Sequence, residues 1–98
     1  MARHDFSPLW EVYPGLIREM GADFDSHEFI LQLARRHQAP YIEALHAYRD
    51  DQPFQTVHGI LSKQLHEYSG LIRHEGENSS PDIFGQVQPC ATWSQVAP

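Results

Sequence analysis

The chain has 98 residues, of which 41 % are hydrophobic and 20 % are charged. This length and composition predict one globular domain, residues 1–98, and exclude an extensively disordered chain. Thirteen acidic residues against seven Lys and Arg give a formal net charge of −6 at pH 7. That balance excludes the strongly basic character of proteins whose affinity comes mainly from phosphate contacts.

Three features of the sequence indicate the compartment. No run approaches the roughly 20 apolar residues of a membrane span, and the first residues lack the apolar core of a signal peptide. The single cysteine, Cys90, cannot form a disulfide within the chain, which is typical of a reducing compartment. We therefore expect a cytoplasmic protein without membrane contact.

The first helical segment is expected between Ser7 and Met20, with an interruption. Ser7 followed by Pro8 is typical of an N-cap and a first helical residue. Pro14 lacks the N–H that a continuing helix needs, so we predict a turn through Tyr13 and a restarted helix over residues 14–20. The expected core stripe of this segment is Trp10, Tyr13, Leu16, Ile17 and Met20.

Two further helices are predicted before the middle of the chain. Asp25 and Glu28 form a capping-box pattern just before an apolar-periodic run, which predicts a helix over residues 26–37. Pro40 is expected to open a third helix that ends near Arg49. The side chains of this helix that should face inward are Tyr41, Ile42, Leu45 and Tyr48.

The fourth predicted helix begins at Pro53 and is expected to end at Gly70, with Asp51 or Gln52 as its cap. Its apolar face consists of Phe54, Val57, Ile60, Leu61, Leu65 and Tyr68. Gly59 within this helix costs roughly 1 kcal/mol relative to alanine. We therefore expect something to approach the backbone at Gly59, and the preceding helix is the simplest candidate.

Short strands are predicted after this helix. Three segments have strand-like patterns: residues 71–75, 83–87 and 91–96. Residues 76–82 are mostly turn formers and indicate a loop. The predicted fold class is therefore α+β, with four helices followed by a small antiparallel β-hairpin or sheet, and we expect Trp93 and Phe84 to contact the core.

The run over residues 65–77 resembles the end of the recognition helix and the start of the wing in winged helix-turn-helix proteins. The matching residues are Leu65, Gly70, Leu71, Ile72 and Arg73. Together with the two helices before it, the resemblance covers roughly residues 26–96 and suggests a winged-helix-like domain. It implies that the helix beginning at Pro53 enters the major groove of DNA, while the hairpin touches the backbone or minor groove.

On that resemblance, the residues expected to bind nucleic acid are Gln55, Thr56, His58, Gly59, Ser62, Lys63, His66 and Arg73. No acidic residue occurs between Pro53 and His66, and Gln, Ser and Thr side chains can hydrogen-bond base edges. The wing departs from this pattern, because Glu75, Glu77 and Asp82 repel phosphates. The predicted function is non-enzymatic DNA recognition or transcription regulation through the fourth helix.

The alternative is a protein–protein interaction module on the same acidic scaffold, acting alone or appended to a larger enzyme. An acidic surface costs such a module nothing, and an aromatic patch would be its binding feature. Trp93, Phe84 and the loop 78–84 are the candidate anchors. The oligomeric state stays open, with a homodimer through the N-terminal helix as one option.

No pattern in the sequence predicts catalysis, a cofactor or a metal. Hydrolase, dinucleotide and P-loop motifs are absent. No two of the seven histidines stand three or four residues apart, the spacing that places two ligands on one helix face. We expect no enzyme, no cofactor and no metal, although a metal site assembled from distant segments is left open. Cys90 is interpreted as a small buried hydrophobic residue.

Overall fold

Helices fill roughly the first two thirds of the chain, and strands fill most of the remainder. The computed structural model describes residues 4–96. Its helices are α1 (Ser7–Trp10), α2 (Tyr13–Glu19), α3 (Ser26–Arg36), α4 (Gln38–Ala47) and α5 (Pro53–Gln64), followed by the 3₁₀ helix η1 (Leu65–Tyr68). Its strands are β1 (Asp23–Asp25), β2 (Ile72–Pro81) and β3 (Val87–Gln95). The predicted α+β class, with helices followed by a small antiparallel hairpin, is confirmed.

The N-terminal segment is split at the proline, as predicted. Pro14 lies in the first turn of α2, where its missing N–H removes no helical hydrogen bond. The predicted cap of α1 is wrong by one residue, because Phe6 and not Ser7 occupies the N-cap position. Ser7 instead donates hydrogen bonds from its backbone N–H and its hydroxyl to the carboxylate of Asp5.

Helices α3 and α4 are separated by a single residue. The Asp25 carboxylate accepts a hydrogen bond from the backbone N–H of Glu28 at 2.8 Å, which confirms Asp25 as the cap of α3. His37, with φ −130° and ψ 59°, leaves the helical region and separates the two helices. Helix α4 begins two residues before Pro40, so the proline lies within its first turn and not at its first position.

Helix α5 begins at Pro53 with Gln52 at its N-cap, as predicted, but its end differs from the prediction. Gln52 occupies the N-cap position with a left-handed φ of 46°, and its side chain makes no capping bond. The hydroxyl of Thr56 donates to the carbonyl of Asp51 at 2.7 Å across the same turn. At the other end the helix tightens into η1, and among the described glycines positive φ values occur at Gly76 and Gly85 but not at Gly70.

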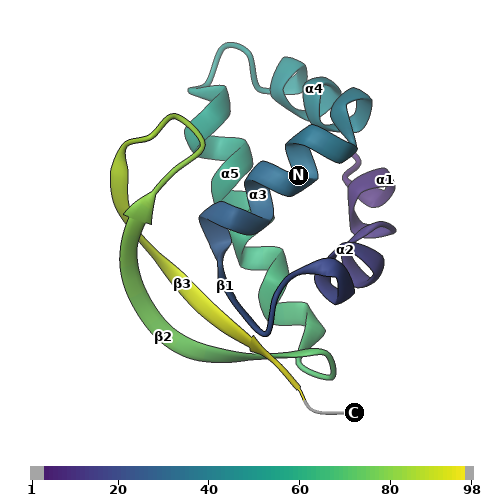
Figure 1. The fold of residues 1–98 in the computed structure, drawn as a ribbon. Coiled ribbons are helices and arrows are strands. Elements are labelled where there is room, and N and C mark those ends of the chain that lie inside the picture. Colours follow the sequence, from purple (N-terminus) through teal and green to yellow (C-terminus); the bar gives the residue numbers. More distant parts are fainter. Residues whose placement is uncertain (1–3, 97–98) are drawn as a thin grey trace.

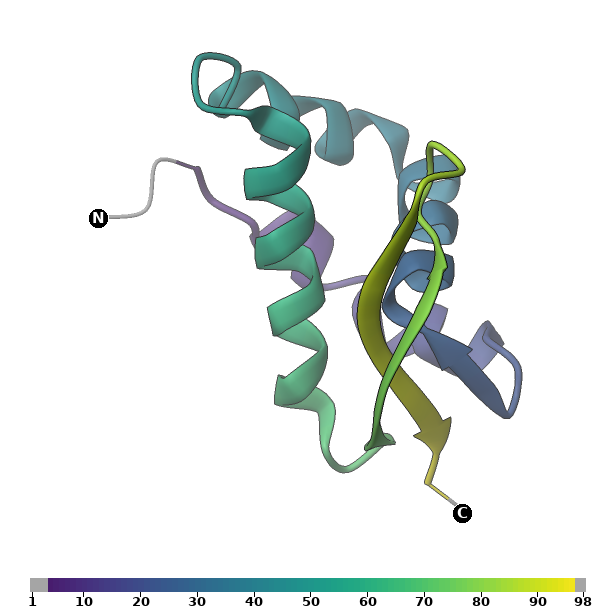
Figure 2. The same ribbon diagram turned by 90° about the vertical axis from the view of Figure 1, so that its left-hand side faces the viewer.

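The described residues contain a three-stranded antiparallel sheet in the order β1-β3-β2. Figures 1 and 2 show its long β2–β3 hairpin curving along one side of the helices, next to α5 and α3. Strand β1 was not predicted, since three residues are too few to show a period; it pairs with residues 92–94 of β3. None of the helices described combines the length and the apolar character that a membrane crossing requires.

The predicted strand boundaries were wrong in the hairpin. The predicted loop 76–82 mostly belongs to β2, and the predicted strand 83–87 is mostly the turn of the hairpin. The turn is built on Asp82, whose carboxylate accepts hydrogen bonds from the backbone N–H groups of Phe84 and Gln86. Pro89 lies within β3, opposite Ser79, in the part of the strand that β1 does not reach. Its missing N–H there breaks no ladder, because a strand edge tolerates proline.

The core is formed where the helices meet the base of the sheet. Trp93 is 2 % exposed, and its indole N–H donates to the hydroxyl of Ser26 at 3.1 Å, so this part of the prediction holds. Phe84 was expected beside it but is 57 % exposed at the hairpin tip. Ile42 was expected to face inward from α4 and is 58 % exposed. The core is completed by the apolar sides of α1 to α5, with Tyr13 at 0 % exposure among them.

Replacing Tyr13 by Phe should lower the free energy of unfolding by about 1 kcal/mol, the usual net worth of one buried hydrogen bond. The Tyr13 hydroxyl donates to the carbonyl of Leu61 at 2.7 Å and so ties α2 to α5. Burial raises the pKa of Tyr13 well above its ordinary value, so the hydroxyl keeps its proton. Urea unfolding monitored by far-ultraviolet circular dichroism measures the change; an unaltered free energy of unfolding would contradict it.

Candidate functional site

Helix α5 presents one exposed polar stripe. Gln55, Gly59 and Lys63 follow one another at four-residue spacing and are exposed, and His66 continues the exposed side in η1. We call these four residues the α5 stripe. Figure 2 shows α5 at the front of the molecule with the hairpin beside it. Arg73, at the start of β2, is also exposed.

The glycine of this stripe has no role in internal packing. A Cβ built on Gly59 meets no atom within 4 Å, so the expectation that the preceding helix approaches the backbone there is wrong. The helix nevertheless carries the cost of roughly 1 kcal/mol that glycine brings. Gly15 in α2 is equally open, but Glu11 and Arg18 lie beside it on the chain, whereas the surroundings of Gly59 on α5 carry no acid. The absence of acidic residues along the α5 stripe, and not the glycine alone, therefore distinguishes this part of the protein surface.

Three residues that were predicted to face outward from α5 are instead half-buried: Thr56, His58 and Ser62. The largest difference is at His58, whose Nε2 lies 2.6 Å from the hydroxyl of Tyr41 and whose ring stacks on the rings of Tyr41 and Phe84. Burial lowers the pKa of His58, which favours a neutral ring whose Nε2 accepts a hydrogen bond from the Tyr41 hydroxyl. His58 therefore packs between α5 and its neighbouring elements and is not one of the exposed residues of the helix.

A groove of about 330 Å³ separates α5 from the hairpin tip, and we call it the hairpin groove. Phe54 and Phe84 form one side of it, with ring centroids 4.7 Å apart in an edge-to-face arrangement. These two rings are 40 % and 57 % exposed. The polar lining includes His58, Asp82 and Gln86. An apolar wall with a few convergent polar groups is the usual character of a binding site.

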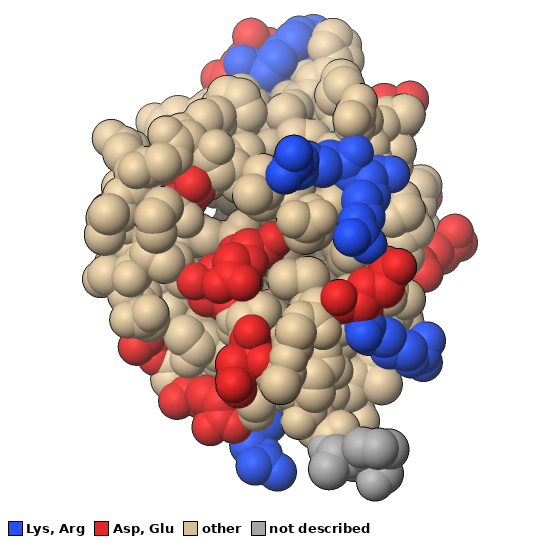
Figure 3. Space-filling view, viewed as in Figure 1, with Lys and Arg blue, Asp and Glu red and all other residues tan. Residues whose placement is uncertain are grey.

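The opposite side of the hairpin is acidic. Four carboxylates line a shallow hollow: Asp23, Asp25, Glu28 and Glu75. Figure 3 shows acidic side chains gathered near the centre and lower left of this face, with basic side chains toward its upper and right parts. Partial burial and the negative charge of Asp25 raise the pKa of Glu28. This hollow favours cations and disfavours phosphates.

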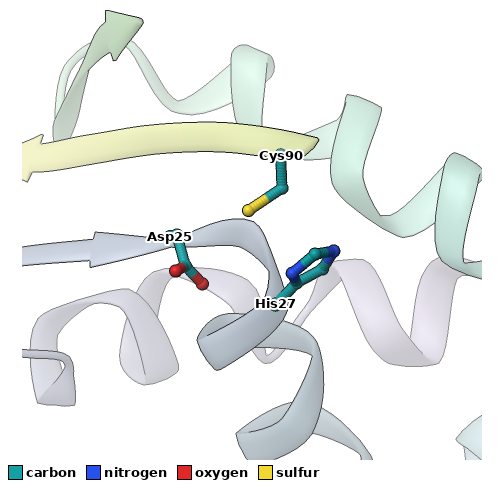
Figure 4. A group of neighbouring side chains, drawn as sticks. All are labelled: Asp25, His27 and Cys90. Carbon is teal, nitrogen blue, oxygen red and sulfur yellow. The ribbon is translucent and has the colours of Figure 1, made fainter. Parts of the chain in front are cut away.

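Asp25, His27 and Cys90 converge where the start of α3 meets β3. One ligand atom from each of these residues lies within 4.8 Å of the other two, and we call the group the Asp25–His27–Cys90 cluster. Figure 4 shows the Cys90 sulfur pointing toward the Asp25 carboxylate and the His27 ring. The Ser80 hydroxyl lies 2.9 Å from His27 Nδ1 and 3.5 Å from the Cys90 sulfur. Cys90 is half-buried, so its interpretation as a buried hydrophobic residue was incomplete.

Lowering the pH from about 7 to about 5 should reduce the stability that His58 contributes. Burial holds its folded-state pKa below the ordinary 6.5, so the unfolded chain binds the proton more readily. The contribution is therefore complete above the unfolded pKa and is lost as the pH falls through the folded pKa. Urea unfolding of the wild type and of His58→Gln measures it. The difference in free energy of unfolding should shrink toward low pH, and a constant difference would contradict the assignment.

The three features adjoin one another around His27. This residue lines the hairpin groove, belongs to the Asp25–His27–Cys90 cluster, and also lines a second hollow with Lys63 and His66 of the α5 stripe. His27 is therefore the residue that these three features have in common. No known protein family, characterised protein or solved structure gave a significant match to this chain.

Proposed function

We propose that the protein is a small non-enzymatic nucleic-acid-recognition module of winged helix-turn-helix type, in which α5 enters the major groove of DNA. The observation that carries the proposal is the α5 stripe: an exposed, acid-free helical surface in a chain of net charge −6, opened further at Gly59 without any internal reason. The hairpin that follows α5 lies beside it, as a wing would (Figure 2).

The chemistry of the stripe suits base edges better than phosphates. The major groove of B-DNA admits an α-helix, and glutamine can bond adenine in a bidentate manner. Gln55 and Lys63 stand two helical turns apart, with Gly59 between them, so the backbone can come close to the bases between the two contacts. The α5 stripe is therefore long enough to contact only a few base pairs.

The acidic surroundings limit how such a module binds. Glu77 shares a hollow with Lys63 and His66, and Asp82 lines the hairpin groove, so both lie close to the DNA backbone in this arrangement. Phosphate contacts are then restricted to residues such as Lys63 and Arg73. Binding should therefore depend on salt less steeply than in basic DNA-binding proteins, because fewer counterions are released.

Lys63→Glu should weaken binding to labelled duplex DNA, and in log–log form the salt dependence should lose a slope of about 0.9 if Lys63 neutralises one phosphate. Fluorescence anisotropy between about 50 and 200 mM salt measures both quantities, with a randomised duplex pool as the ligand. Arg18→Glu makes the same charge change at an exposed position of α2 and serves as the matched control. Equal losses for the two variants would assign the effect to net charge and reject the α5 stripe.

A second variant keeps the test independent of charge. In Gly59→Leu the new Cβ meets no atom within 4 Å, so the variant should keep the fold and raise helix stability by up to about 1 kcal/mol. On the proposed mode the added side chain holds α5 away from the bases, and DNA affinity falls. If the wild type shows no duplex binding even at about 50 mM salt, the nucleic-acid proposal is rejected.

A protein-interaction function is the second candidate, and the exposed Phe54–Phe84 pair favours it. Aromatic residues with a polar rim are typical of the residues that dominate binding energy at interfaces. The occupant that fits the hairpin groove is a short peptide segment with one apolar side chain, packed against the two contacting rings and close to the polar groups of His58 and Asp82. An acidic surface does not oppose such a partner.

Peptides selected against the wild-type protein from a random display library should bind Phe84→Ser at least about tenfold more weakly, which corresponds to about 1.4 kcal/mol. Ile42→Ser is the matched control, since Ile42 is similarly exposed but lies on α4 and does not line the groove. Isothermal titration calorimetry gives the affinities. Peptides that bind Phe84→Ser as tightly as the wild type would exclude the groove as their site.

A further inference from the structure

We propose that the Asp25–His27–Cys90 cluster binds a divalent transition-metal ion, and specifically Zn²⁺. This function is independent of the proposed nucleic-acid binding and rests on different residues. The cluster combines a sulfur, a nitrogen and an oxygen donor, the three ligand types that zinc accepts in proteins. The thiol and imidazole select against Mg²⁺ and Ca²⁺, which prefer oxygen ligands throughout.

The separations of the donors suit a small ion. All three ligand atoms lie within 4.8 Å of one another. Zinc bonds of about 2.0 to 2.3 Å in tetrahedral geometry require donors that are roughly 3.3 to 3.8 Å apart, so the cluster has to contract by about one ångström. Rotations of the half-buried His27 and Cys90 side chains can supply this movement.

Asp25 is the fixed point of the cluster. It is 6 % exposed, and one of its carboxylate oxygens accepts the capping hydrogen bond from Glu28 N–H at 2.8 Å. A carboxylate has two oxygens, so the cap and a metal ion can be served by the same side chain. The cap thereby orients the ligand, as hydrogen bonds to ligating carboxylates commonly do in metal sites.

The contacts that His27 and Cys90 now make are replaceable. Both approach the hydroxyl of Ser80, and the contact to sulfur, at 3.5 Å, is of a weak type. Exchanging these contacts for bonds to zinc leaves a fourth tetrahedral position, which a water molecule or the Ser80 hydroxyl can fill. Three protein ligands and one open position are typical of zinc sites that keep solvent access.

The charge around the cluster favours a cation. Asp23, Glu28 and Glu75 line the hollow that Asp25 shares. Glu77 and Lys63 both line the hollow that contains Cys90 and His27, so carboxylates outnumber cationic side chains around the cluster. This field opposes phosphates on the same side of the hairpin but stabilises a divalent ion. The excess of acidic residues on the hairpin is unfavourable for a DNA-binding wing, but at this site it would stabilise a bound metal ion.

Bound zinc would fasten β3 to the first turn of α3. Because His27 also lines the hairpin groove, the ion would fix the position of the hairpin relative to α5. A ligand that binds only the folded chain raises its stability in proportion to the logarithm of the ligand concentration. The thermal midpoint of the reduced protein should accordingly rise when Zn²⁺ is added and fall back with a chelator.

Titration of the reduced full chain with Co²⁺, which substitutes for Zn²⁺ and absorbs visible light, tests the site directly. We expect a thiolate-to-cobalt charge-transfer band that saturates at one ion per chain and disappears on adding Zn²⁺. Cys90→Ser should abolish the band, and His27→Ala and Asp25→Asn should each weaken cobalt binding by at least about tenfold, or about 1.4 kcal/mol. His46→Ala, which removes a histidine from the exposed side of α4, should leave both the band and the affinity for cobalt unchanged.

Each variant should lose metal binding without unfolding, so weaker cobalt binding reports on the ligand and not on the fold. Asparagine is as good an N-cap as aspartate, so Asp25→Asn keeps the start of α3 while it removes the charged ligand. Circular dichroism in the presence of chelator verifies that each variant is folded. The proposal is overturned if no thiolate band forms, if His27→Ala binds cobalt as tightly as the wild type, or if one ion is held by the cysteines of two chains.

Discussion

The antiparallel pairing of β1 with β3 fixes the base of the hairpin relative to α3, and the Asp25–His27–Cys90 cluster depends on it. Only three residues, Asp23–Asp25, join β3 on this side, yet they place the first turn of α3 beside the middle of the hairpin. Trp93 is buried at this junction and is tied to Ser26 by its indole N–H. The same junction brings Cys90 to Asp25 and His27, and it holds the hairpin against α5. Further contacts between the hairpin and the helices come from the Phe54–Phe84 and His66–Trp93 ring pairs and from the Ser26 hydroxyl, which donates to the carbonyl of Ala91.

The helices could be predicted from the sequence because their signals are local. The Asp25 cap, the break at Pro14 and the apolar spacing of α5 involve residues within one or two turns of one another. The strands could not be predicted as well, since their pairing overrides local preference. Residues 76–81 are rich in turn formers, but they extend because β3 supplies the partner groups for their backbone. The true turn begins only at Asp82, whose side chain organises it.

The same distinction applies to the sites. The α5 stripe follows from helical periodicity and from the missing acids, so Gln55 and Lys63 were placed correctly on the exposed side. His58 was not, because the Tyr41 and Phe84 rings that enclose it come from other elements. The Asp25–His27–Cys90 cluster leaves no spacing signal at all: Cys90 is more than sixty residues from the other two ligands along the chain. Only the register of β1 on β3 brings them together.

One irregularity interrupts the ladder of the long hairpin near its base. The register of β2 on β3 shifts between His74 and Gly76, and Gly76 has a φ of 125°, which other residues rarely adopt. Beyond this bulge the hairpin curves beside the helices (Figure 1), and Phe84 in its turn contacts Phe54 of α5. The path of the hairpin toward α5 therefore depends on the backbone at Gly76 as well as on the Phe54–Phe84 contact at the far end. A substitution at Gly76 would strain this conformation and so alter the groove without changing any residue that lines it.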